Sequence, residues 1–284
     1  TAGSRSRIGR HGGPDGNNSD FIQPDAAIHR GNSGGALAHT DGEVVGINTW
    51  IASTTGGSIG LGFSIPINNA VRAIDDIIAK GAVRYGWLGV LLTDIGKPAL
   101  GNLGIGDRRG AFIGHVFSDG PAAKGGLKPG DFVTAIDGKT VSSLDQLVRI
   151  VGDLPVGAKS AFKVIRDGKP VELKVTIDER KETSAADYSR LWPGLEVTGT
   201  DDDRIKTDTI PKGTKGVVVT SVIAKSPAAT LGLKAGDILT EMNDTPLDGV
   251  ASFYRLLNDS RTQKFQFSVL REGQTLSTLA LIRK

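Results

Sequence analysis

The chain has 284 residues, a formal net charge of +3 and no cysteine, which allows two or three domains and excludes disulfides, thiol catalysis and cysteine-based metal sites. Its charges are interspersed and no apolar run reaches the ~18 to 20 residues of a membrane helix, which excludes a nucleic-acid-binding stripe and a membrane span. The 39 glycines and 5% aromatic residues predict a mainly β fold with short helices, and because no secretory signal opens the chain we expect a mature or truncated soluble product.

The first distinctive segment is Asp25-Ala-Ala-Ile-His-Arg-Gly-Asn-Ser-Gly-Gly35, which sets Ser33 among glycines. A serine hydroxyl becomes a nucleophile only when a base removes its proton, and the oxyanion that follows needs donors placed in advance. Because glycine tolerates unusual dihedral angles, the N–H groups of Gly31 and Ser33 can turn inward together as an oxyanion hole. The pattern predicts a catalytic Ser33, although a plain Gly/Ser turn could also produce this pentapeptide.

An amphipathic helix is expected next, over residues 67–80. Gly81 follows it directly, and a glycine just past the last periodic residue is a typical helix stop. Its apolar stripe of Val71, Ile74 and Ile78 predicts packing against a core. We place the end of the first domain here, at about residue 79.

The remainder of the chain contains one module twice. The motif Gly126-Leu-Lys-Pro-Gly-Asp131 returns as Gly232-Leu-Lys-Ala-Gly-Asp237, and Trp87 returns as Trp192, about 105 residues later in each case. That period is too long for a solenoid, so each copy should bury its own core. We place the copies at residues 82–179 and 188–284, joined by a polar and flexible or weakly helical linker over 178–187.

Within the first copy, most segments are expected to be strands. Residues 132–136 alternate and run into the hairpin turn Asp137-Gly138, and residues 162–177 form two strands around Asp167-Gly168. Ser143 and Gln146 have capping-box spacing, which predicts a helix over about 143–153.

The serine segment, preceded by Phe21-Ile-Gln and followed by Gly42-Glu-Val-Val-Gly-Ile-Asn-Thr49 and Ile59-Gly-Leu-Gly-Phe-Ser-Ile-Pro66, closely resembles the second barrel of the HtrA trypsin-fold proteases. In such enzymes the first barrel supplies the triad histidine and aspartate and the second supplies the serine. The resemblance therefore implies that residues 1–79 are only the C-terminal barrel, that the N-terminal barrel is absent, and that the triad histidine and aspartate are not in this chain. None of its four histidines has the family's context: His11, His29, His39 and His115, the last expected in a strand and partly exposed.

The resemblance also assigns substrate-binding positions. Ile28 and Ile51 should line the pocket for the residue before the scissile bond, beside Asn32. Asn48, Thr49 and Trp50 lie on the strand that pairs with the substrate backbone. Trp50 replaces a small residue, so it either restricts the pocket or packs in the barrel core, and strand alternation favours the core.

The repeated module closely resembles PDZ domains, which read C-terminal peptides by adding the peptide to a sheet edge. The loop whose N–H groups hold the peptide carboxylate would be Trp87-Leu88-Gly89-Val90 in the first copy and Trp192-Pro193-Gly194-Leu195 in the second. Because Pro193 has no N–H, the second loop loses one donor. A plain β-turn is the alternative at each loop.

These resemblances imply an HtrA-type serine endopeptidase of envelope protein quality control. Its PDZ domains would capture unfolded or C-terminal peptide substrates, in a periplasmic homo-oligomer of three or more subunits. The alternative is a proteolytically inactive, truncated relative that binds polypeptides or acts as a chaperone. We expect no cofactor, no metal, no nucleic acid and no membrane span.

Overall fold

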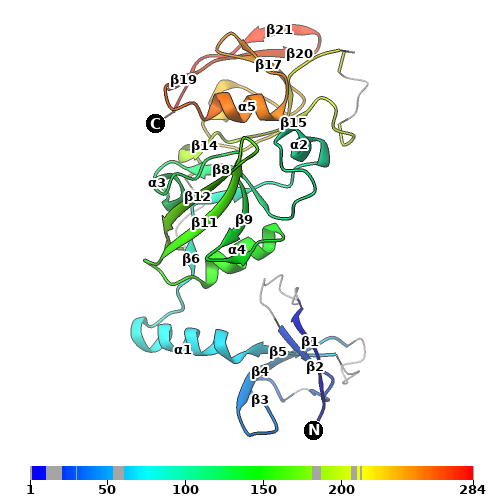
Figure 1. Ribbon diagram of the computed structural model, residues 1–284, viewed down its shortest axis with the longest axis vertical. Helices are drawn as coiled ribbons and strands as arrows, with labels where there is room; N and C mark the ends of the chain where they lie inside the picture. Colours follow the sequence, from blue (N-terminus) through cyan, green and yellow to red (C-terminus); the bar gives the residue numbers. More distant parts are fainter. Residues whose placement is uncertain are drawn as a thin grey trace. The chain divides into compact units, whose positions relative to one another are not determined.

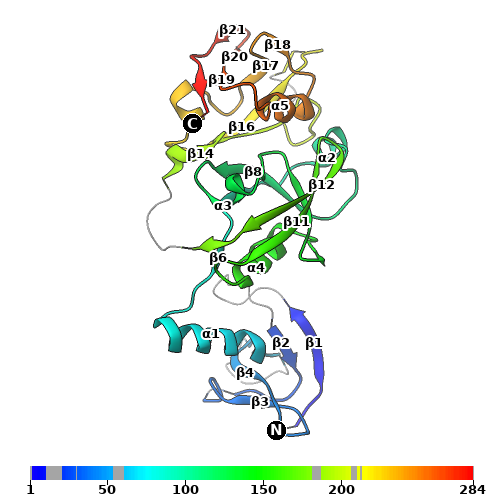
Figure 2. The ribbon, with the colours of Figure 1, turned by 60° about the vertical axis from the view of Figure 1, so that its left-hand side comes forward.

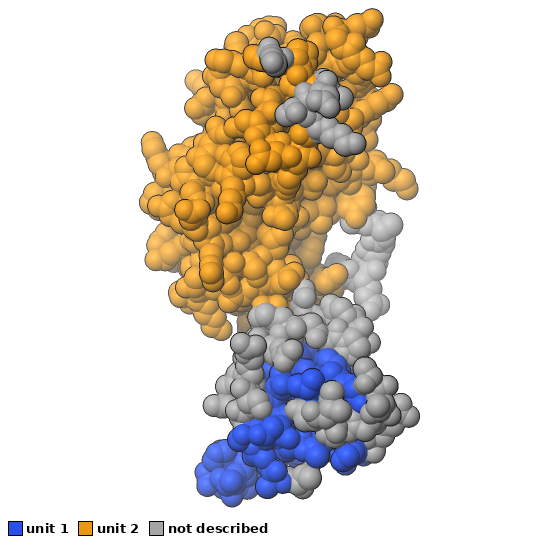
Figure 3. All heavy atoms as spheres, turned by 90° about the vertical axis from the view of Figure 1, so that its right-hand side faces the viewer, with its two compact units in different colours: residues 1–84 blue, residues 85–284 orange. Residues whose placement is uncertain are grey.

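The computed structural model describes residues 2–10, 21–29, 31–53, 61–180, 187–205, 210, 211 and 213–283. The chain divides into two compact units, residues 1–84 and 85–284, which are coloured separately in Figure 3. The second unit contains both copies of the repeat, called here the first repeat and the second repeat. Strands dominate and the helices are short, which confirms the predicted fold class. None of the described helices is long and apolar enough to cross a membrane.

The first unit is built on an antiparallel sheet with the strand order β1-β2-β5-β4-β3. Its strands are β1 (Arg5–Arg10), β2 (Phe21–Pro24), β3 (Ala36–Ala38), β4 (Val44–Ile51) and β5 (Gly62–Pro66). An aromatic cluster joins three of them. Trp50 of β4 stacks on Phe63 with ring centroids 4.0 Å apart, and Phe21 meets both rings edge-on at 6.1 Å.

Helix α1 (Ile67–Lys80) follows β5 and ends as predicted, because Gly81 adopts φ +80° and donates its N–H to the Ile77 carbonyl. The prediction that its apolar stripe packs in a core is wrong for this structure. Val71, Ile74 and Ile78 are 49%, 48% and 80% exposed, and Ala70 is the buried residue of the helix. The helix contacts β4 and β5, but these contacts do not cover its apolar stripe.

The first repeat contains the strands predicted over 132–136 and 162–177 and the helix predicted over about 143–153, together with helices α2 and α3, which were not predicted (Figure 1). Its elements are β6 (Gly86–Trp87), β7 (Val90–Leu92), α2 (Lys97–Asn102), β8 (Ala111–Phe117), α3 (Pro121–Lys124), β9 (Phe132–Ile136), β10 (Lys139–Thr140), α4 (Leu144–Asp153), β11 (Lys159–Arg166), β12 (Lys169–Thr176) and β13 (Asp178–Glu179). Ser143 caps α4 by accepting the Gln146 N–H, as expected. Both predicted turns form with positive φ, at Asp137-Gly138 and Asp167-Gly168.

The second repeat has a similar order of strands, without a described counterpart of α2 (Figure 2). Its elements are η1 (Tyr188–Arg190), β14 (Leu191–Trp192), β15 (Leu195–Gly199), β16 (Val217–Val222), η3 (Ala228–Leu231), β17 (Ile238–Met242), β18 (Thr245–Pro246), α5 (Val250–Leu257), β19 (Lys264–Phe265), β20 (Phe267–Arg271), β21 (Gln274–Ser277) and β22 (Leu281–Ile282). Strand β14 does not join the sheet of its own repeat. It extends the first repeat's sheet, which has the order β12-β11-β9-β8-β14.

Two expectations about these repeats need correction. His115 lies in β8 as predicted, but it is 1% exposed rather than partly exposed. Its strand is paired with both β7 and β14, and its ring faces Glu196 of the second repeat. The polar linker begins in regular structure, because β13 pairs with β6; residues 181–186 lie outside the described residues.

The repeated Gly-Asp motif forms one structural clamp in each repeat. Asp131 accepts the Lys128 N–H at 2.8 Å and both Nε and Nη2 of Arg166 at 2.6 and 2.7 Å. Asp237 binds Lys234 and Arg271 with the same geometry. Both aspartates are buried. The motif that reveals the repeat is therefore a buried, hydrogen-bonded ion pair that holds a turn to a distant strand.

We predict that Arg166→Ala destabilises the first repeat by about 3 to 5 kcal/mol, because it leaves the buried Asp131 carboxylate without its partner. Urea unfolding measures this loss. Lys163→Ala is the matched control on the same strand, since Lys163 and Glu172 form an ion pair whose side chains are 59% and 71% exposed. It should change the midpoint little. Equal effects of the two substitutions would contradict a structural role for the clamp.

We predict that Trp50→Ala lowers the stability of the first unit by about 3 to 5 kcal/mol, because it empties the stack against Phe21 and Phe63. Hydrogen exchange of the β4 and β5 amides reports on this unit directly. Val44→Ala, at a position on β4 that is 43% exposed, is the control and should leave exchange nearly unchanged. Unchanged protection in Trp50→Ala would contradict the packing role.

Candidate active site and peptide-binding loops

Ser33 lies on a tight turn between β2 and β3. The Asn32 N–H donates to the His29 carbonyl at 3.0 Å, and the Asn32 side chain accepts the His29 N–H at 2.9 Å. Gly31 and Gly34 adopt φ +97° and +85°, a region that favours glycine. The glycines predicted to shape the serine turn therefore occupy positions where a side chain would strain the backbone.

The turn is fixed to β4 by backbone hydrogen bonds. The Gly34 N–H donates to the Asn48 carbonyl at 2.8 Å, and the Asn48 N–H donates to the Gly35 carbonyl at 2.9 Å. The Ser33 hydroxyl is exposed and donates to the Thr49 carbonyl at 2.9 Å. The structure thus brings Ser33 together with Asn48 and Thr49.

The backbone N–H groups of Gly31 and Ser33 are the donors that the sequence assigns to an oxyanion hole. Among the described residues, neither the Gly31 N–H nor the Ser33 N–H donates to a backbone carbonyl.

The described residues place no imidazole on the Ser33 hydroxyl. His29 is four residues away in sequence and exposed, and its backbone N–H donates to the Asn32 side chain within the turn. Asp25 is engaged elsewhere, because its carboxylate accepts the Ser4 hydroxyl at 2.6 Å and the Ser4 N–H. These hydrogen bonds hold the pKa of Asp25 below its usual range. Asp25 therefore fixes the serine segment to Ser4.

The two isoleucines assigned to the substrate pocket lie near each other. Ile51 pairs with Gly62 across β4 and β5, and a side chain at Gly62 would meet the Ile28 side chain at 2.6 Å. Ile28 is buried and Ile51 half-buried. Trp50, the next residue on β4, belongs to the aromatic cluster with Phe21 and Phe63.

The carboxylate loop of the first repeat is open at its strand edge. Phe117 donates its N–H to the Gly89 carbonyl at 2.9 Å, which makes the Val90–Val116 pair a non-hydrogen-bonded pair. The Val90 N–H therefore points away from β8, and no described strand pairs with β7 on that side. Leu88 is buried in the core of this repeat, whereas Val90 is half-buried.

The second loop has the same backbone frame. Ile223 donates to the Gly194 carbonyl at 2.9 Å, as Phe117 does to Gly89, and Leu195 pairs with Val222 as Val90 does with Val116. The environment differs, because residues 191–195 are all buried. Sequence reasoning found both loops but gave no sign of this difference in exposure.

Comparisons with known proteins agree with this architecture. Residues 86–177 and 193–281 each match the PDZ domain family, and residues 1–74 match the trypsin family. The periplasmic serine endoprotease DegP of Salmonella typhimurium is 37% identical over 279 residues, which is 98% of this chain and 57% of that protein. A probable DegP-like periplasmic endoprotease of Brucella suis is 39% identical over 245 residues, covering 86% of this chain and 48% of that protein.

Solved structures give the same result. The HtrA-type protease AlgW with a decapeptide is 40% identical, with a TM-score of 0.51 over 64% of this chain and 56% of that one. The chain thus spans about half the length of the relatives it matches. It belongs to the HtrA family of trypsin-like proteins, with two PDZ domains following its trypsin-family segment.

Proposed function

We propose that this chain is part of an HtrA-type serine endopeptidase that degrades unfolded polypeptides, with Ser33 as the nucleophile and the Gly31 and Ser33 N–H groups as the oxyanion hole. The observation that carries the proposal is the geometry of the Ser33 turn. The exposed Ser33 hydroxyl donates to Thr49 of β4, and the N–H groups of Gly31 and Ser33 have no described backbone acceptor. Such preplaced donors serve acyl transfer and have no role in a plain turn.

One observation favours the alternative, a polypeptide-binding protein or chaperone without activity. The Ser33 hydroxyl donates to the Thr49 carbonyl, and a carbonyl oxygen is too weak a base to remove its proton. A histidine and an aspartate from outside this chain would supply that chemistry in the parent enzyme. We therefore propose that residues 1–79 are the C-terminal barrel of a protease domain and that this chain alone is nearly inert.

The substrate would be delivered by the first PDZ domain. Its carboxylate loop directs the Val90 N–H to an open edge, where a peptide can add as a strand. Helix α4 offers the 42% exposed Val148, an apolar side chain that suits an apolar last residue. We further propose, from the names of the relatives, that the protein acts in the periplasm. A homo-oligomer of three or more subunits is likewise proposed from the family alone.

We predict that a fluorophosphonate labels Ser33 of this chain at least about 10³-fold more slowly than an active trypsin-like protease, because among the described residues the Ser33 hydroxyl donates to a carbonyl and not to an imidazole. The residual adduct should still form at Ser33, because the oxyanion donors remain. Mass spectrometry locates the adduct, and Ser33→Ala is the control. Labelling as fast as in an active protease would contradict the prediction that Ser33 is not activated in this chain. Adducts spread over surface serines would contradict the proposed site.

We predict that Val148→Arg weakens binding of a short peptide with a C-terminal leucine at least about tenfold, because a charge replaces the apolar wall of the groove. Leu276→Arg is the matched control, since Leu276 is also 42% exposed but lies on β21 of the second PDZ domain. Isothermal titration with the peptide and its C-terminal amide gives both affinities. Unchanged affinity in Val148→Arg would argue against this groove.

A further inference from the structure

Strand β15 and helix α5 correspond to β7 and α4 of the first PDZ domain, so the peptide groove of the second PDZ domain would lie between them. Helix α2 of the first PDZ domain contacts both of these elements, and Figures 1 and 2 show it beside α5. Its residue Ala99 and the following Leu103 and Ile105 are at most 4% exposed. They belong to the same hydrophobic cluster as Leu195 of the carboxylate loop.

The two groove helices differ at one equivalent position. Val148 on α4 is 42% exposed, whereas its counterpart Tyr254 on α5 is 3% exposed. Tyr254 meets Phe112 of the first PDZ domain edge-on, with ring centroids 5.3 Å apart. A side chain at Gly130 of the first domain would come within 2.8 Å of the Tyr254 ring. The face of α5 that would contact a peptide is therefore packed against the first domain.

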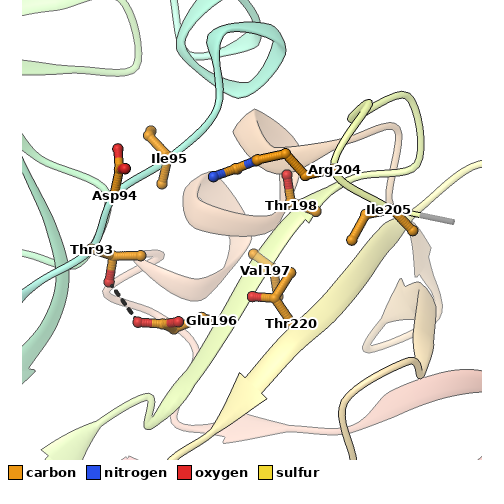
Figure 4. A pocket seen from close by; sticks show the side chains of 9 residues that line it. All are labelled: Thr93, Asp94, Ile95, Glu196, Val197, Thr198, Arg204, Ile205 and Thr220. Atoms are coloured by element: carbon orange, nitrogen blue, oxygen red, sulfur yellow. Dashed lines mark hydrogen bonds between the residues drawn. The ribbon is translucent and has the colours of Figure 1, made fainter.

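Polar contacts hold this packing at two places. The Asn258 side-chain amide donates to the Pro129 carbonyl at 2.6 Å, and Lys128 Nζ donates to the Asn258 carbonyl at 3.2 Å. On β15, Glu196 accepts the Thr93 hydroxyl at 3.0 Å. A pocket of ≈ 340 Å³ lies beside this last bond (Figure 4). Buried apolar residues of both domains belong to one hydrophobic cluster.

We infer that α2 and the residues up to Ile105 occupy the peptide groove of the second PDZ domain in cis, so that this groove is an intramolecular docking site and the pair offers one peptide site. The first domain contributes the buried apolar side chains that a bound peptide would otherwise supply. One part of this inference, that the first groove takes up a peptide, rests on the proposed function. The other part, that α2 fills the second groove, does not depend on that function.

Single cysteines test this inference in the full chain, which has no thiol of its own. Ala99→Cys reports on the filled groove, Val148→Cys on the open groove and Leu276→Cys on plain surface. We expect a maleimide to modify Ala99→Cys at least about 100-fold more slowly than either of the others, because a buried thiol reacts only when the structure opens. A rate within about threefold of Val148→Cys would overturn the inference.

A peptide with a C-terminal leucine separates this inference from the proposed function. It should protect Val148→Cys and leave the slow rate of Ala99→Cys unchanged. Failure to protect Val148→Cys would count against peptide capture by the first groove. The labelling rates of Ala99→Cys and Leu276→Cys would still test whether the second groove is filled. Faster labelling of Ala99→Cys with peptide would overturn the closed groove, since it would mean that peptide displaces α2.

The substitution Tyr254→Ala tests the same inference by removing a side chain from the interface between the two domains. In that background Ala99→Cys should react at least about tenfold faster, whereas Val148→Ala, the matched change on α4, should not alter its rate. Ala228→Cys, fully buried in the second domain, reports on the fold of that domain itself. Faster labelling at Ala99 with continued protection at Ala228 supports a separable interface. An equal rise at both positions would overturn it.

Discussion

Backbone N–H and C=O groups at a strand edge need partners, and the strands β7, β8 and β15 differ in what lies beside them. Strand β8 pairs with β14 of the following domain, through Leu191 and Trp192. Strand β15 contacts α2 of the first domain. No described strand pairs with the second edge of β7. The two copies of one module thus differ in what adjoins their corresponding strands.

The serine turn also depends on hydrogen bonds to a neighbouring strand. Its geometry comes from β4, which binds Gly34 and Gly35 through Asn48. The conformation of the turn that carries Ser33 is therefore set by residues of the first unit, and the described acceptor of its hydroxyl is the Thr49 carbonyl.

Local chemistry made much of this predictable from the sequence. The Asp-Gly turns, the Ser143 cap and the Gly81 stop form as expected because each depends on a few neighbouring residues. Burial set by distant segments was not predictable. His115 and Tyr254 are covered by residues far away in the chain, and the stripe of α1 is left uncovered although its periodicity is that of a packed helix. The sequence indicated the serine turn and both loops, but it gave no indication that another segment of the chain packs over the second loop and α5.

The pairing of β14 with the sheet of the first PDZ domain matters when this protein is divided into fragments. A first PDZ domain ending at residue 180 would lose the strand that pairs with Val116 and Phe117. It would also bare Phe112 and Phe132, which pack in the cluster shared with the second domain. A fragment with a free strand edge and exposed aromatic rings tends to self-associate. The tandem pair, rather than either domain alone, is thus the smallest piece that keeps these contacts between the two PDZ domains.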